Sequence, residues 1–344
     1  MSTIQDVAAR AGVSVSTVSN VLNKREARMR PETLARVHQA IADLRFRPNL
    51  SARMLKTGRM PMIGLMVPSI ANPYFGVLAR WVEESAREHG YGVLLCNTYR
   101  SPEREKEYAQ AFMAQGVKGV ILGSALLDHE HLIPLVEQGL AAVSLDRVSA
   151  ADGLLRDFVS VDNHLAAVMV VEHLIGLGHR HISFVSAPVQ SLNRIARLDG
   201  ARQTCQRLGA ELNVVTGSDF GAYDESEMSE IGQLAARSLI RARCPSTAYV
   251  GVNDMLAIGL LAGLQQSGLQ VPTEVSVMGI DGIYLGAYVS PGLTTVRQPM
   301  QDIAAAAVDH VLSRMNEPGI DSRVSIFPPS LVLRGSAGPA VIAR

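Results

Sequence analysis

Small hydroxyl and amide side chains are concentrated near the start of the chain, where their types and spacing suit contact with DNA. Residues 3–23 read TIQDVAARAGVSVSTVSNVLN. Two short helical patterns are joined at Gly12, where a side chain would obstruct a sharp turn. The second pattern turns side chains outward that could enter a major groove: Val15, Ser16, Thr17, Ser19 and Asn20. The pattern predicts a helix-turn-helix that binds DNA, with two ordinary bundle helices as the alternative.

Capping and apolar residues mark the two helices of this pattern. Thr3 with Asp6 forms a capping-box pattern, and Ser14 can accept from the free N–H groups of the next turn. Apolar residues recur at helical spacing in both helices: Ile4, Val7 and Ala8 in the first, and Val18, Val21 and Leu22 in the second.

Charge is distributed unevenly along the chain. Residues 1–59 carry eleven Lys and Arg against four Asp and Glu, a net charge of +7, whereas the whole chain carries 32 of each sign. The remainder therefore carries −7. This asymmetry indicates a basic head that contacts phosphates and an acidic body that does not.

A third helix and a short hinge segment are expected after the pair. Pro31 suits the first turn of a helix over 31–44. Pro48 ends that pattern, and residues 50–56 are too few for a stable helix in water. Such a segment would be ordered only against a partner or DNA; a plain linker is the alternative.

From Met62 onward, apolar strands alternate with amphipathic helices. The expected strands are 62–68, 93–98, 119–123, 141–146, 159–162, 181–187, 247–253, 275–280 and 294–297. Helical patterns between them include 77–89, 103–114, 165–177, 197–208, 255–267 and 303–315. This alternation predicts parallel sheets, and the number of strands favours two similar subdomains with a cleft between them. Polar residues that follow several strands, such as Asp146 and Asp281, would lie at that cleft, although helix capping is the alternative.

Composition and missing motifs argue against a secreted protein, a membrane protein, a metalloprotein and an enzyme. The 344 residues are 47% hydrophobic, enough for a small head and one or two ordinary domains. No signal-peptide pattern or membrane-length apolar run is present, so we expect a cytoplasmic protein without a membrane partner. The three cysteines are widely spaced, and the His-x-His runs at 129–131 and 179–181 lack a third ligand. With no nucleotide-binding or hydrolase motif either, we expect no catalytic residues, metal or cofactor.

Taken together, the chain resembles the lactose-repressor/galactose-repressor family of transcription regulators over essentially its whole length. Besides the head, the segments that fit are 46–55, 63–75, 173–180, 253–259 and 293–299. The resemblance implies an N-terminal all-α helix-turn-helix head and an α/β periplasmic-binding-protein-like body of two doubly wound subdomains.

The resemblance also implies domain boundaries. The head would span 1–47, the hinge helix and linker 48–61, and the effector-binding and dimerisation domain 62–340. Three strands would cross between the subdomains, near Val159, Pro291 and Ile326. The N-terminal subdomain would then hold about 62–159 and 291–325, and the C-terminal one about 160–290 and 326–340.

For DNA, the resemblance implies a homodimer on a pseudopalindromic operator. Val15, Ser16 and Asn20 would read base edges, and Thr17 and Ser19 would hold phosphates. Leu55 would wedge between central base pairs in the minor groove. The other residues expected at the DNA are Thr3, Ser14, Asn23, Arg30, Ala52 and Lys56.

For the body, the resemblance implies a small-molecule effector in the cleft. The matching positions are Tyr74, Phe75, Asp146, Asn193, Arg197, Phe220, Asn253 and Asp281. Arg197 and Asp281 could bracket hydroxyls or an anionic group.

Two positions depart from the family pattern. Arg30 stands where a Ser usually caps the third helix, which weakens the cap, and Gly282 replaces the second carboxylate of a Gly-Phe-Asp-Asp run. The chain also ends without a leucine heptad, which favours a dimer.

The expected function is therefore a sequence-specific transcriptional repressor that is switched allosterically by a sugar or sugar acid. Alternatives are a nucleobase or nucleoside co-repressor in the same family, and a solute-binding module without a DNA role.

Overall fold

The computed structural model describes residues 2–22, 29–44, 46, 61–123, 126–146, 157–187, 191–216 and 227–341. The chain divides into two compact units, Met1–Met60 and Pro61–Arg344. Each unit has a hydrophobic core of its own among the described residues.

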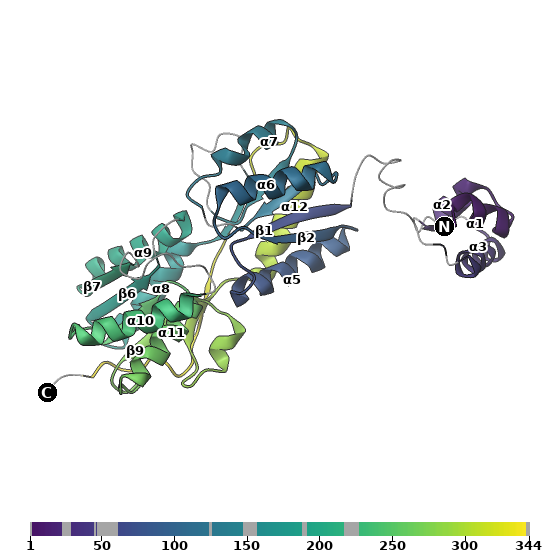
Figure 1. Cartoon of the computed structure of the whole chain (residues 1–344). Helices are drawn as coiled ribbons and strands as arrows, with labels where there is room; N and C mark the ends of the chain where they lie inside the picture. Colours follow the sequence, from purple (N-terminus) through teal and green to yellow (C-terminus); the bar gives the residue numbers. More distant parts are fainter. Residues whose placement is uncertain are drawn as a thin grey trace. The chain divides into compact units, whose positions relative to one another are not determined.

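The described residues of the first unit, the head, form three helices (Figure 1): α1 Ile4–Ala11, α2 Val15–Leu22 and α3 Pro31–Asp43. Val7, Val18 and Val37 are buried where the helices meet. The expected capping box is present, since Thr3 Oγ1 accepts from the Asp6 N–H and Asp6 accepts from the Thr3 N–H. Gly12 is left-handed with φ +61°, as the sharp turn requires.

The third helix of the head confirms the expected weak cap and shows what compensates for it. Arg30 makes no side-chain cap hydrogen bond, and Pro31 occupies the first turn. Two arginines instead tie the helices together. Arg36 donates to the Gly12 carbonyl at 2.9 Å, and Arg10 pairs with Asp43 at 2.9 Å.

The first sheet of the body is six-stranded, in the order β11-β5-β4-β3-β1-β2, and its strand pairs are parallel. The strands are β1 Met62–Val67, β2 Gly92–Asn97, β3 Gly119–Leu122, β4 Ala141–Ser144, β5 Asp157–Val161 and β11 Val324–Phe327. The helices are α5 Pro73–Glu88, α6 Pro102–Ala114, α7 Ile133–Glu137 and α12 Met300–Asn316.

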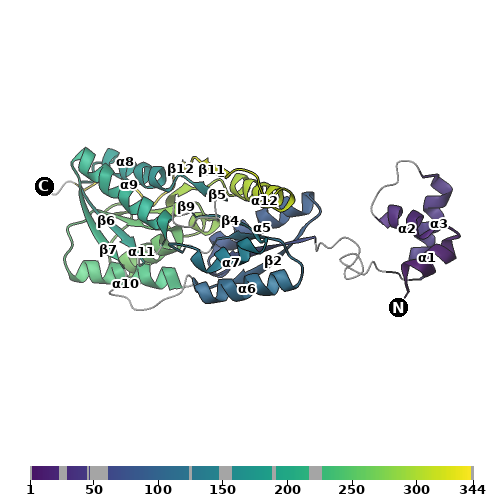
Figure 2. The same ribbon diagram turned by 90° about the horizontal axis from the view of Figure 1, so that it is seen from above.

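Alternation along β1 explains how the helices cover this sheet. Ile63 and Leu65 point to the face on which α5 and α12 pack side by side (Figures 1 and 2). Gly64 points to the other face, where an added Cβ would lie 2.5 Å from Phe112 of α6. The aromatic ring therefore fills the space above this glycine.

The second sheet is also six-stranded, in the order β12-β10-β9-β8-β6-β7, with β12 antiparallel to β10 and the other pairs parallel. The strands are β6 His181–Ser186, β7 Glu211–Thr216, β8 Ala248–Gly251, β9 Ser276–Asp281, β10 Thr294–Arg297 and β12 Ser330–Val332. Helices α8 Asn163–Gly176 and α9 Leu192–Leu208 cover one face, and α10 Met228–Arg241 and α11 Asp254–Gln266 cover the other (Figure 2).

Glycines allow these helix pairs to approach closely. A Cβ on Gly259 of α11 would lie 1.9 Å from the Ser229 carbonyl oxygen, and one on Gly232 of α10 would lie 2.1 Å from the Leu256 oxygen. Because backbone atoms cannot move aside as side chains can, larger residues would separate α10 from α11.

Two sheets with helices on both faces confirm the expected architecture, but the second of the three crossings between the sheets differs from the expectation. Thr294–Arg297 pairs with β9 of the second sheet, so the second crossing follows at Gln298 and Pro299 rather than near Pro291. The third crossing follows β11, after Phe327, next to the expected Ile326. The first follows β5, after Val161, two residues beyond the expected Val159.

The sequence patterns also missed several elements. The expected strands did not include β7, which is an edge strand of the second sheet and alternates exposed and half-buried residues at its start. Among the residues that the structure describes, no helix is both long enough and apolar enough to cross a membrane.

Candidate effector cleft and DNA-binding head

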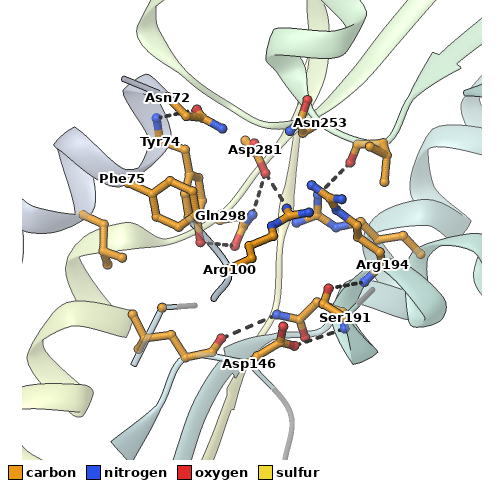
Figure 3. A pocket seen from close by; sticks show the side chains of 16 residues that line it. Asn72, Tyr74, Phe75, Arg100, Asp146, Ser191, Arg194, Asn253, Asp281 and Gln298 are labelled. Carbon is orange, nitrogen blue, oxygen red and sulfur yellow. Dashed lines mark hydrogen bonds and ion pairs between the residues drawn. The ribbon is translucent and has the colours of Figure 1, made fainter. Parts of the chain in front are cut away.

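The loop after β1 places two aromatic side chains at a cavity between the sheets of the body. Asn72 caps α5 by accepting from the Tyr74 N–H at 3.1 Å, and Pro73 occupies the first turn. Tyr74 and Phe75 therefore project from the start of the helix into the cavity (Figure 3). Their rings meet edge to face at 5.0 Å.

The cavity is lined from both lobes, a lobe being one sheet with its helices. Together with the open solvent at its mouth, the space between its lining residues measures about 640 Å³. Its apolar walls include Leu78, Leu145 and Val252, while eleven of its sixteen lining residues carry polar side chains. The polar residues are Asn72, Tyr74, Arg100, Asp146, Ser191, Asn193, Arg194, Arg197, Asn253, Asp281 and Gln298.

Arg197 makes three side-chain hydrogen bonds at the cavity. It is 8% exposed, because α9 turns it inward. Its Nε atom donates to Asn163 Oδ1 at 2.7 Å and its Nη1 atom to the Val252 carbonyl at 2.7 Å. Its Nη2 atom pairs with Asp281 Oδ1 at 3.3 Å. The guanidinium is thus fixed by groups from three elements before any ligand binds.

Asp281 ends β9 in a strained conformation with φ +145°. Burial raises the pKa of its carboxyl group, while the neighbouring Arg197 opposes that rise. The next residue, Gly282, has φ +73°, and a Cβ there would lie 2.6 Å from Arg297. A side chain at position 282 would therefore collide with Arg297, which is a steric reason for Gly282 in place of the second Asp of the Gly-Phe-Asp-Asp run.

A chain of hydrogen bonds runs from Tyr74 to Arg197. The Tyr74 hydroxyl donates to Gln298 Oε1 at 3.1 Å, and Gln298 Nε2 donates to Asp281 Oδ1 at 2.8 Å (Figure 3). Burial raises the pKa of the Tyr74 hydroxyl far above its usual range, so it remains a donor at neutral pH. The crossing residue Gln298, which our site prediction omitted, is one link between the lobes.

Asp146 and Asn193 lie next to each other. The Asn193 N–H donates to Asp146 Oδ1 at 3.1 Å, and Asn193 Nδ2 contacts the Leu145 carbonyl at 3.5 Å. Asp146 is 2% exposed. Asp146 follows β4 of the first sheet and Asn193 begins α9 beside the second, so this is a further direct contact between the lobes.

Asn253 both caps a helix and lines the cavity, the two roles expected for a polar residue at the end of a strand. It caps α11 by accepting from the Leu256 N–H at 2.9 Å, and it also lines the cavity. Its neighbour Asp254 is not part of the cavity lining and accepts from Thr295 Oγ1 and from the Ile283 N–H. Burial and the charge of Asp281 raise the pKa of Asp254 to about 7.

The cavity therefore unites seven of the eight predicted effector residues: Tyr74, Phe75, Asp146, Asn193, Arg197, Asn253 and Asp281. Phe220 lies outside the described residues. The prediction omitted Arg100, Arg194 and Gln298, which also line the cavity. Arg194 could have been found from its spacing, because it lies one helical turn before Arg197 on the same face.

In the head, α2 carries the predicted base-reading side chains on its surface. Val15, Ser16 and Asn20 are exposed, whereas Thr17 and Ser19 are half-buried. Ser14 accepts from the Thr17 N–H at 3.2 Å, as its position predicted. Thr3 and Arg30 are also exposed. Four further predicted DNA contacts lie outside the described residues: Asn23, Ala52, Leu55 and Lys56.

Both units of the chain match known protein families. Residues 3–49 match the model of bacterial regulatory proteins of the lacI family, and residues 171–337 match a periplasmic binding protein-like domain. The chain is 33% identical to the ribose operon repressor of Halalkalibacterium halodurans, over 97% of this chain and 96% of that one. It is 30% identical to the HTH-type transcriptional repressor PurR of Aliivibrio fischeri, over 98% of each.

A solved structure agrees with these matches. The crystal structure of the lac repressor dimer bound to operator and the anti-inducer ONPF superposes with a TM-score of 0.83 at 26% identity. That superposition covers 98% of this chain and 99% of the other. Because the likeness to repressors extends over nearly the whole of both chains, this protein belongs to the lacI family of bacterial regulatory proteins and is a DNA-binding transcriptional regulator.

Proposed function

We propose that this protein is a cytoplasmic repressor that binds a pseudopalindromic operator as a homodimer and responds to a sugar or sugar acid in its cleft. The observation that carries the effector assignment is the fixed Arg197–Asp281 pair in a cavity where eleven of the sixteen lining residues carry amide, hydroxyl or charged groups. Such a lining offers many donors and acceptors to the hydroxyl groups of a carbohydrate.

The names of the relatives support this ligand class and this assembly. One relative is a ribose operon repressor, and the lac repressor was crystallised as a dimer on its operator. We assign the cleft a binding role rather than a catalytic one, because the matched relatives are transcriptional regulators.

Within the head, we assign base recognition to Val15, Ser16 and Asn20. Asn20 is exposed on α2, and its amide can pair with adenine in the major groove. The net charge of +7 over residues 1–59 supports phosphate contact by this end of the chain.

Switching requires that the ligand binds one arrangement of the lobes better than the other. The lobes meet at Asp146–Asn193 and at Tyr74–Gln298, and both contacts border the cavity. A ligand that competes with or reinforces these contacts changes the relative free energies of the two arrangements. We propose that the segment 48–61 passes this difference to the head.

The test begins with the operator. Selection of DNA from a genomic library by the full-length protein should yield a pseudopalindromic site, and the fragment 62–344 should bind no DNA. Sugars, sugar acids and nucleosides are then screened by thermal shift, because a ligand of the folded state raises its stability by mass action. Full-length protein without sequence preference, or equal DNA binding by the fragment, would refute the proposal.

A further inference from the structure

Two buried polar side chains bracket the first crossing between the lobes. Ser160 belongs to β5 and is 5% exposed, and Asn163 begins α8 and is 4% exposed. Only Val161 and Asp162 separate them along the chain. In the part of the chain that the structure describes, neither is among the residues that line the cavity. They are therefore placed to act on the site through other residues, and their hydrogen-bond partners show which ones.

The side-chain amide of Asn163 ties Arg197 to this crossing. Its Oδ1 atom accepts from Arg197 Nε at 2.7 Å. Its Nδ2 atom donates to the Val161 carbonyl at 3.1 Å and to Ser160 Oγ at 3.4 Å. An amide carries one acceptor oxygen and two N–H donors, and a guanidinium can only donate. Because the oxygen must therefore face Arg197, the two donors must face the crossing.

The hydroxyl group of Ser160 continues this route to a contact between the lobes. It accepts from Asn163 Nδ2 and donates to Asn193 Oδ1 at 3.3 Å. The backbone N–H of Asn193 in turn donates to Asp146 Oδ1. Arg197 is thus connected to the Asp146–Asn193 junction through the crossing, in addition to the turn of α9 that Asn193 and Arg197 share.

The two contacts between the lobes are therefore the ends of one hydrogen-bonded chain. At Arg197 the route through the crossing meets the route that runs through Asp281 and Gln298 to Tyr74 (Figure 3). Hydrogen bonds in such a buried chain polarise one another, so a change at one member alters its neighbours. In order, the members are Asp146, Asn193, Ser160, Asn163, Arg197, Asp281, Gln298 and Tyr74.

Ser160 is the member whose bonds depend most directly on the angle between the lobes. It belongs to the first sheet, whereas its partners Asn163 and Asn193 begin helices of the second lobe. Its contacts, at 3.3 and 3.4 Å, are long for hydrogen bonds of a hydroxyl group. A small rotation about the crossing therefore breaks them or brings them to normal length.

We infer, on the basis of the proposed function, that Asn163 and Ser160 are positioning residues for the allosteric response. Asn163 fixes the plane of the Arg197 guanidinium. Ser160 passes a change at Arg197 to the Asp146–Asn193 junction. A ligand that draws the guanidinium into the cavity pulls on the amide of Asn163 and thereby on the hydroxyl of Ser160. Binding at Arg197 thus acts on both contacts between the lobes.

The first test needs no ligand and uses hydrogen exchange of the Asn193 backbone amide in the full-length protein, measured by NMR. Ser160→Ala and Asn163→Asp, which keeps an acceptor for Arg197 but loses both N–H donors, should each accelerate exchange by about threefold or more. The double variant should not exceed the larger single effect, because both substitutions break the same route. Ser160→Thr keeps the hydroxyl group and should stay within about twofold of the wild type.

Ser183→Ala is the matched control for this test. Ser183 is a fully buried strand serine of the second sheet, and its hydroxyl group bonds Ser246 and Asn213 instead. It should leave exchange at Asn193 unchanged. Additive effects of Ser160→Ala and Asn163→Asp, or equal acceleration in the control, would overturn the route. If Asn163→Asp does not fold, as judged by circular dichroism, the comparison of Ser160→Ala with Ser160→Thr decides.

The second test separates binding from response. The probes are D-ribose, D-glucose, D-gluconate and adenosine; calorimetry gives their affinity, and fluorescence anisotropy gives the operator affinity with and without each of them. For a probe that changes operator affinity in the wild type, Ser160→Ala should keep its affinity within about threefold and reduce the change by at least about fivefold. A residue with only a structural role would not produce this split. A full response in Ser160→Ala would overturn the inference.

The outcomes separate this inference from the proposed function. If no sugar or sugar acid changed operator affinity, the proposed ligand class would be wrong, and the exchange measurements would still decide whether the route exists. A normal sugar response together with unchanged exchange in Ser160→Ala would overturn the inference and support the proposed function.

Discussion

Asp146 and Asn193 join the two lobes directly, with the Asn193 N–H donating to Asp146 Oδ1 at 3.1 Å. Both residues line the cavity, so a ligand bound there contacts the junction itself. Since α9 begins at Leu192, the same junction fixes the start of the helix that carries Arg194 and Arg197.

Asp146→Ala should release this junction. Hydrogen bonds to charged groups contribute about 1.5–3 kcal/mol, so amide exchange at Asn193 should accelerate by about tenfold or more. The measurement is hydrogen exchange of the body by NMR or by mass spectrometry of the 191–197 segment. Asp146→Asn retains an acceptor and should show a smaller effect. Unchanged exchange in Asp146→Ala would show that the contact does not hold the lobes.

Arg197→Gln should abolish the effector response and leave operator binding within about twofold. The substitution removes one partner of a buried pair, so the free energy of unfolding should also fall by about 3 kcal/mol. Operator affinity with and without effector gives the response, and urea unfolding gives the stability. A normal effector-induced change in operator affinity would place Arg197 outside the binding site.

Asp254 should make the body less stable as pH rises. Its pKa is raised from 3.8 to about 7, mainly by burial, so the folded state holds the proton more tightly than the unfolded state does. Between about pH 4 and pH 7 this group therefore costs increasing stability as it ionises. Asp254→Asn does not titrate, so the Tm of the wild type minus that of the variant should decrease from pH 5 to pH 8.

Asp281 titrates in the same direction, because burial also raises its pKa. The variant therefore keeps part of the pH dependence, and only the difference between the two proteins reports on Asp254. Parallel Tm curves across this range would contradict a raised pKa for Asp254.

Gly259→Ala should destabilise the body by about 2–3 kcal/mol through overpacking. The new methyl group would meet the backbone of Ser229, so α10 and α11 would have to separate. Gly76→Ala is the matched control, because no atom lies within 4 Å of a Cβ on this helical glycine. The control should be neutral or gain up to about 1 kcal/mol, and an equal loss in both variants would refute the packing explanation.

Leu55→Ala should weaken operator binding by about 10- to 100-fold and change binding to random DNA by less than about threefold. Leu55 belongs to the segment outside the described residues, and the prediction follows from its expected role as a wedge on a deformable central step. Fluorescence anisotropy on both DNAs gives the two affinities. Equal losses would exclude the wedge.

Local patterns were enough to predict the head and most elements of the body. The Thr3–Asp6 capping box, the left-handed Gly12 and the buried Val7 and Val18 each depend on residues a few positions apart. Periodicity and strand-end polar residues, together with the family resemblance, likewise indicated Arg197 and Asp281. A capping or periodic interaction is decided within one or two turns, which is the distance over which sequence patterns act.

Tertiary structure alone decided how distant residues meet. The sequence placed the second crossing near Pro291, whereas β10 pairs with β9 and moves the crossing to Gln298. That shift makes Gln298 the link between Tyr74 and Asp281. Arg100 and Arg194, 94 positions apart, line the same cavity because two sheets present their carboxyl ends to one space. The sequence thus determined which side chains are available, and packing of the two lobes decided which of them share a low-dielectric cavity, because that depends on contacts between segments that no local spacing specifies.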